Sequence, residues 1–125
     1  RYESLNFSFE IEDKMDVIAD IIFMRENFYL TYDTGNMTTV GIDHEDYLHM
    51  FYEKINNIHL KDRAKDNSTV EPLTGNTNFT KIFAKLKEVG YNGIYTLQTA
   101  RDKTGLETET IKRHINIFKE LYDEC

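Results

Sequence analysis

The sequence predicts an α/β fold in which parallel strands alternate with helices, and two patterns carry this prediction. Four stretches show apolar residues at the three- and four-residue steps of an amphipathic helix, and three short runs rich in aromatic and β-branched residues lie between them. Apolar residues make up 40% of the 125 residues, which is enough for a packed core, and no linker rich in proline or serine divides the chain. We therefore expect one unit over residues 1–125.

The helices are recognised by their apolar faces and their end signals. The first is expected from Ile11 to near Asn27, with acidic residues between its apolar positions. Asp43 and Asn78 are good N-cap residues and begin the second and third helices, and Gly90 stops the third. The last helix carries an apolar stripe at Ile111, Ile115, Phe118 and Tyr122.

Strands are expected at residues 28–33, 57–62 and 94–99, where aromatic and β-branched side chains concentrate. Gly35 and Asn36 close the first strand into a loop. The connection from Arg63 to Thr77 is long and without regular structure, and such connections are more often functional than decorative.

Charge and cysteine content exclude several functions. The chain has 22 acidic and 15 basic residues, a formal charge of −7, so its overall charge gives no general electrostatic reason to bind nucleic acid. No apolar run is long enough to span a bilayer. Cys125 is the only cysteine, which excludes an internal disulfide and favours a reducing, cytoplasmic location.

Polar residues at the expected strand ends are the candidates for chemistry, because the carboxyl ends of parallel strands share one face of the sheet. Asp33, His59 and Gln98 stand at the three ends and offer oxygen and nitrogen donors suited to Mn²⁺, Zn²⁺, Mg²⁺ or Co²⁺. Each also has a structural alternative. A strand-terminal Asp is often a cap or turn residue, and a lone His in a strand is usually a hydrogen-bonded structural residue.

Four motifs in order carry a resemblance. They are Tyr32–Asn36, Ile58–Asp62, Gly75 followed by the helix start at Asn78-Phe79, and Gly90–Gly93 before a strand. Over roughly residues 30–122 the chain resembles the xylose isomerase-like (β/α)8-barrel superfamily of sugar isomerases, epimerases, inosose dehydratase and class II apurinic endonucleases. The resemblance implies a single partial domain, the C-terminal half of a TIM-type barrel, because a complete barrel needs about 250 residues.

The resemblance also implies a ligand set for one divalent ion. Asp33 and His59 match the ligands of the sixth and seventh strands, and Gln98 stands where the eighth strand has Glu. Glu3 precedes Asp33 by thirty positions, the interval implied for the fifth-strand Glu, and is the expected ligand and catalytic base. Since Gln cannot accept a proton, only one base would remain.

The implied function is a metal-dependent sugar or sugar-phosphate isomerase or epimerase that removes a proton next to a carbonyl. Alternatives are a non-catalytic carbohydrate-binding barrel, a dehydratase, and an apurinic endonuclease, which the acidic charge disfavours. The expected partners are a small sugar or sugar phosphate and the missing N-terminal half-barrel or a homo-oligomeric partner, with no nucleic acid or membrane. The expected substrate-binding residues are Asn36, Lys61, Asp62 and Arg101.

Overall fold

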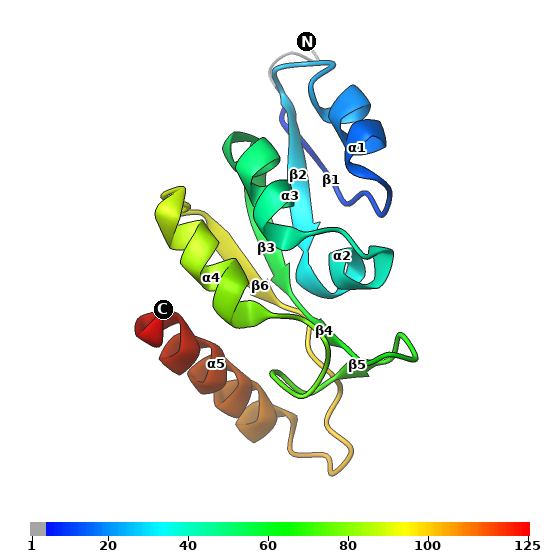
Figure 1. Ribbon diagram of the computed structural model, residues 1–125. Helices are drawn as coiled ribbons and strands as arrows, with labels where there is room; N and C mark the ends of the chain where they lie inside the picture. Colours follow the sequence, from blue (N-terminus) through cyan, green and yellow to red (C-terminus); the bar gives the residue numbers. More distant parts are fainter. Residues whose placement is uncertain (1–4) are drawn as a thin grey trace.

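The computed structural model describes residues 5–125 and is built around a sheet of four parallel strands (Figure 1). The strand order is β1-β2-β3-β6, so the four strands of this sheet lie side by side in the order in which they occur along the chain. A short antiparallel pair, β4 with β5, follows β3. The bounds are β1 Phe7–Phe9, β2 Phe28–Asp33, β3 Ile55–Leu60, β4 Asp62–Arg63, β5 Thr69–Val70 and β6 Ile94–Leu97.

Helices connect the strands, and the predicted end signals act as expected. Asp43 caps α3 by accepting a hydrogen bond from the backbone N–H of Asp46, and Asn78 caps α4 in the same way. Gly90 has a positive φ of 74° just beyond α4, a conformation that glycine adopts without strain. The bounds are α1 Met15–Ile22, α2 Thr34–Val40, α3 His44–Phe51, the short 3-10 helix η2 Tyr52–Lys54, α4 Phe79–Glu88 and α5 Glu107–Glu124.

One face of the sheet is apolar and packs against the helices (Figure 1). Side chains alternate between the two faces of a strand, so Leu30 and Tyr32 of β2 and Ile58 of β3 all enter this layer. They are fully buried, as are the helix residues that meet them. The helix side of the core is formed chiefly by Ile18, Ile22, Tyr47, Leu48, Phe51, Phe79, Ile82, Phe83, Leu86 and Phe118.

The opposite face, which we call the inner face, is polar. The hydroxyl of Ser8 lies 2.7 Å from that of Thr31 and donates to Asn56 Oδ1 at 2.8 Å. Thr96 on β6 donates to Asn57 Oδ1 at 2.9 Å. Hydroxyl and amide groups therefore connect β1 to β2 and β3, and β3 to β6, on the side away from the helices.

The structure corrects four details of the sequence analysis. The first helix runs from Met15 to Ile22 rather than from Ile11 to near Asn27, and residues 7–9 before it form the unpredicted strand β1. The expected loop at Gly35 and Asn36 is the first turn of α2. The long connection after β3 contains the β4–β5 pair. In α5 the buried stripe is Thr110, His114 and Phe118, whereas Ile111 and Ile115 are exposed.

Within residues 5–125, the structure contains no helix whose length and apolar character would allow it to cross a bilayer.

Candidate metal centre

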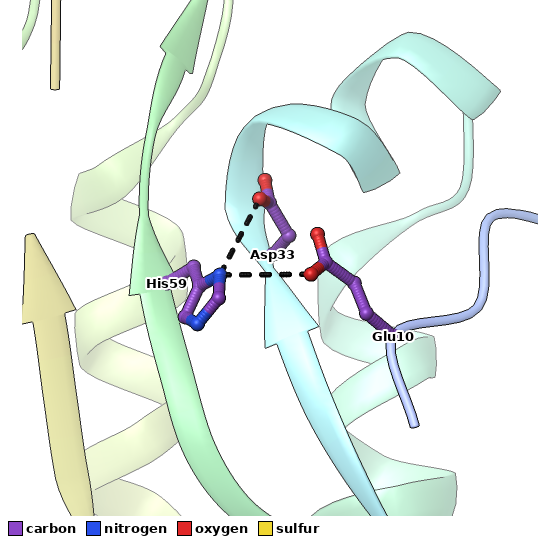
Figure 2. Close-up of side chains that lie close together, drawn as sticks. All are labelled: Glu10, Asp33 and His59. Carbon is purple, nitrogen blue, oxygen red and sulfur yellow. Dashed lines mark ion pairs between the residues drawn. The ribbon is translucent and has the colours of Figure 1, made fainter. Parts of the chain in front are cut away.

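Three side chains from three neighbouring strands meet on the inner face at the carboxyl ends of the strands (Figure 2). Asp33 is the last residue of β2 and is in register with His59 of β3. Glu10 directly follows β1, and two-residue alternation places it on the same face as Ser8. The potential ligand atoms of the three side chains all lie within 4.8 Å of one another.

His59 lies at the centre of this group. Its Nδ1 is 3.7 Å from Glu10 Oε2 and 3.9 Å from Asp33 Oδ2 (Figure 2). Both separations are longer than a hydrogen bond, so the three atoms surround a space rather than satisfying one another. Glu10 is the most exposed of the three, with 36% of its side chain accessible, and Asp33 is buried.

Of the buried atoms in this group, His59 Nδ1 has no hydrogen-bond partner, and Asp33 Oδ2 has only an ion pair with the Lys61 ammonium, at 3.1 Å. Buried polar atoms without a partner are rare because their desolvation is not compensated. Here both face the same space, and together with Glu10 they form a set of two carboxylates and one imidazole. These donors fit Zn²⁺, Mn²⁺ or Co²⁺, so the residues present suit a divalent ion.

The local fold fixes the carboxylate of Asp33. Its Oδ1 accepts a hydrogen bond from the backbone N–H of Asn36 at 2.9 Å and so caps α2, while Oδ2 points toward His59. The next residue, Thr34, donates to the carbonyl of Lys61 at 2.7 Å and accepts from the Lys61 N–H at 3.0 Å. The end of β2 is therefore tied to the end of β3, which keeps Asp33 and His59 adjacent.

Positive charge lies beside the acidic group. The Lys61 ammonium is 3.1 Å from Asp33 Oδ2, and Lys61 is itself buried. Partial burial raises the pKa of Glu10, and the hydrogen bond and negative charge of Asp33 raise it further. Of the expected substrate residues, Lys61 and Asn36 both contact the candidate ligands, Lys61 through Asp33 and Asn36 through Asp33 and Glu10.

Asp62, another expected substrate residue, organises the loop after β5. One carboxylate oxygen accepts from the Gly75 N–H at 2.9 Å and the other from the Thr77 N–H at 3.1 Å, and the side chain is buried. Gly75 is needed here, since a Cβ would lie only 2.5 Å from the carbonyl oxygen of Arg63. The hydrogen bonds made by Asp62 are to its own chain.

Arg101 lies away from the three-residue group. It is exposed and lines a cavity of about 730 Å³ between β5, the loop after β6 and the first turns of α5. Arg113 and Glu71 line the same cavity and form an ion pair at 2.6 Å. A substrate-binding role for Arg101 stays a prediction.

The structure brings together two of the four predicted ligands, Asp33 and His59. Glu3 lies outside the described residues. Gln98 follows β6 directly, is exposed, and donates its backbone N–H to the carbonyl of Leu60 at 3.1 Å. Its role as a ligand stays a prediction.

Glu10 is the residue that the sequence analysis missed. The signal for it was present, since Phe7, Ser8, Phe9 and Glu10 alternate apolar and polar side chains as a short strand does. It precedes Asp33 by 23 positions, 33 − 10, rather than the thirty used to select Glu3.

A parallel β/α sheet with carboxylates and a histidine gathered at its carboxyl ends defines the class of protein, a β/α-barrel protein represented here by a partial barrel. Comparison with known proteins makes this more specific. The chain belongs to the xylose isomerase-like TIM barrel family, whose model matches residues 2–121.

Two curated relatives match parts of the chain. An uncharacterised protein of Methanocaldococcus jannaschii, MJ1311, is 28% identical over 118 residues, which cover 87% of this chain and 38% of that protein. The inosose dehydratase of Geobacillus kaustophilus is 30% identical over 92 residues, covering 59% of this chain and 30% of the enzyme. The chain thus spans well under half the length of these curated relatives.

Solved structures confirm the fold. A xylose isomerase domain protein from Planctomyces limnophilus has a TM-score of 0.76 at 17% identity, covering 95% of this chain and 46% of its own. D-allulose 3-epimerase from Methylomonas sp. has a TM-score of 0.75 at 17% identity, with 93% and 48% covered. The IolI protein, solved with a bound zinc atom, has a TM-score of 0.73 at 18% identity, with 94% and 44% covered.

Proposed function

We propose that this chain forms the C-terminal part of a metal-dependent isomerase or epimerase acting on a sugar or sugar derivative. The observation that carries the proposal is the convergence of Glu10, Asp33 and His59, with the buried Nδ1 of His59 lacking a hydrogen-bond partner and facing both carboxylates. Family membership and the likeness to D-allulose 3-epimerase support the substrate class.

In this proposal Glu10, Asp33 and His59 hold the divalent ion, with Gln98 as a further amide ligand. When bound, the ion would polarise the substrate carbonyl and so acidify the C–H bond beside it. The buried Asp33 would hold the ion in place, while the more exposed Glu10 would face the substrate.

Glu10 takes the part of the general base that the sequence analysis assigned to Glu3. Its carboxylate removes the proton from the carbon next to the carbonyl, and the electron pair of that C–H bond moves toward the carbonyl group. In an isomerase Glu10 then returns the proton to the former carbonyl carbon, while the proton of the neighbouring hydroxyl passes to the former carbonyl oxygen and a new carbonyl forms at the neighbouring carbon.

The test uses the full-length protein that contains this chain. Ketohexoses, including D-allulose, are incubated in D₂O with the protein after chelation and after restoring Mn²⁺, Co²⁺ or Zn²⁺, and deuterium at the carbon beside the carbonyl is measured by mass spectrometry. We expect metal-dependent incorporation. His59→Ala should lose both bound metal and exchange, whereas His49→Ala, at an exposed position on α3, should lose neither.

Unchanged metal content in His59→Ala would overturn the ligand assignment. Metal binding without exchange on any sugar would instead support a non-catalytic carbohydrate-binding barrel.

A dehydratase is the second candidate, favoured by the match to inosose dehydratase. The same base would remove the proton beside the carbonyl, but a hydroxyl group on the next carbon would then leave as water. Inosose incubated with the metal-loaded protein would lose the mass of water, and a sugar isomerase would leave that mass unchanged.

A further inference from the structure

Asn36 occupies a central place among the charged groups around the candidate metal centre. It lies in the first turn of α2 and is 4% exposed. Its side-chain amide donates to Glu10 Oε1 at 2.9 Å and also to Glu12. Its amide oxygen accepts from Arg63 Nη2 at 2.8 Å and from Lys61 Nζ at 3.4 Å.

These neighbours fix the orientation of the amide. The N–H groups face two carboxylates, and the oxygen faces two cations. Rotation by 180° would place the oxygen against Glu10 and Glu12 and the N–H groups against Lys61 and Arg63, so every hydrogen bond would be lost. The side chain therefore has one orientation, and it is set by charges on both sides.

Asn36 contacts two of the three candidate ligands through different groups. Its backbone N–H binds Oδ1 of Asp33, and its side chain binds Oε1 of Glu10. The oxygens left over, Asp33 Oδ2 and Glu10 Oε2, are the two that lie near His59 Nδ1, at 3.9 and 3.7 Å (Figure 2). One residue thus occupies one oxygen of each carboxylate and leaves the other for an ion.

We propose that Asn36 is a positioning residue that orients Glu10 for metal binding, rather than a residue that contacts the sugar. This inference rests on the metal centre proposed above. It replaces the substrate-binding role expected from the sequence, because both ends of the amide are already bonded within the protein. Outer hydrogen bonds of this kind change metal affinity by about 10- to 100-fold.

The test measures Co²⁺ binding to the full-length protein by its visible absorption spectrum, which reports affinity and coordination geometry independently of activity. Asn36→Leu keeps the volume, and the backbone N–H to Asp33, but removes the side-chain donor. We expect Co²⁺ affinity to fall about tenfold or more and the spectrum to change. Asn36→His supplies a ring N–H donor and should restore affinity to near the wild-type value.

Thr38→Val is the matched control. Thr38 lies two positions further along α2 and bonds Thr34, His44 and Thr77, none of which is a candidate ligand. We expect it to lower the melting temperature while leaving Co²⁺ affinity and the spectrum unchanged.

Wild-type affinity and spectrum in a folded Asn36→Leu would overturn the positioning role and leave the metal centre standing. If wild-type protein binds no Co²⁺, the proposed metal centre fails and the inference fails with it. If Asn36→Leu does not fold, Asn36→His decides the matter, since it keeps a donor and lacks the amide oxygen. Near wild-type Co²⁺ binding then supports the role of the donor, and tenfold weaker binding overturns it.

Discussion

His44 should make the stability of this protein fall as the pH drops below neutrality. Its two ring nitrogens contact the hydroxyls of Tyr32, at 2.6 Å, and Thr38, at 2.9 Å, between β2, α2 and α3. Burial lowers the pKa of His44 from 6.5 to about 4, although Asp43 opposes the shift. A neutral ring is thus required in the folded protein, while the unfolded chain takes up a proton near pH 6.5.

The direction and size of the pH effect on stability follow from the difference between the pKa of His44 in the folded protein and in the unfolded chain. Between pH 6.5 and 4 the unfolded chain binds more protons at His44 than the folded protein does, so the free energy of unfolding decreases as the pH falls. A difference of 2.5 pKa units, 6.5 − 4, corresponds to a loss of about 3 kcal/mol once the pH is below both values. At pH 5 the loss would be about 2 kcal/mol.

Urea unfolding of the full-length protein at pH 7.5 and pH 5 would measure this effect. We expect His44→Asn to be less stable than wild type at pH 7.5, because two buried hydrogen bonds are lost, and the gap to narrow by about 2 kcal/mol at pH 5. His49→Gln, at an exposed position on the same helix, should show the pH dependence of the wild type. A constant gap between His44→Asn and wild type would refute the reasoning.

Three further predictions concern the candidate site. Lys61→Met should strengthen Co²⁺ binding by about tenfold or more, since it removes a cation next to Asp33. It should also destabilise the metal-free protein, because the buried Asp33 carboxylate loses its ion pair. Weaker Co²⁺ binding in a titration would contradict the first expectation. Gln98→Glu should also tighten Co²⁺ binding, by about tenfold, because it adds a carboxylate at the end of β6. An unchanged dissociation constant for Co²⁺ would place residue 98 outside the ligand set. Gly75→Ala should lower the free energy of unfolding by about 1–3 kcal/mol, because the added Cβ would clash with the Arg63 carbonyl and move the loop away from Asp62. A melting temperature equal to that of the wild type would contradict this.

The sequence located Asp33 and His59 well because both belong to strongly patterned strands. β2 matches its predicted range of residues 28–33, whereas β3 covers residues 55–60 instead of 57–62 and β6 ends at Leu97 instead of residue 99. Asp33 and His59 still fall within the observed strands. The helix caps at Asp43 and Asn78 were equally clear, since each uses a side chain that bonds a backbone N–H three residues later.

Glu10 could not be placed in the same way. β1 has only three residues, and the apolar positions of the expected helix begin at Ile11, so the helical pattern outweighs the short alternation of residues 7–10. The roles of Asn36 and Asp62 depend on partners 13 to 27 positions away in sequence, which no local pattern reveals. In α5 the apolar stripe pointed to Ile111 and Ile115, yet the helix buries His114, which bonds Thr99, and leaves both isoleucines exposed.

The polar inner face affects how this chain can join the rest of a barrel. The apolar core of the chain lies between the sheet and its own helices, whereas the opposite face of the sheet carries hydroxyl and carboxamide groups that are hydrogen-bonded to one another. Apart from the exposed Ile94, enclosing that face would bury little apolar surface, so contact with further barrel segments would depend largely on main-chain pairing along the outer edges of β1 and β6. The interior along this face would then stay accessible to water.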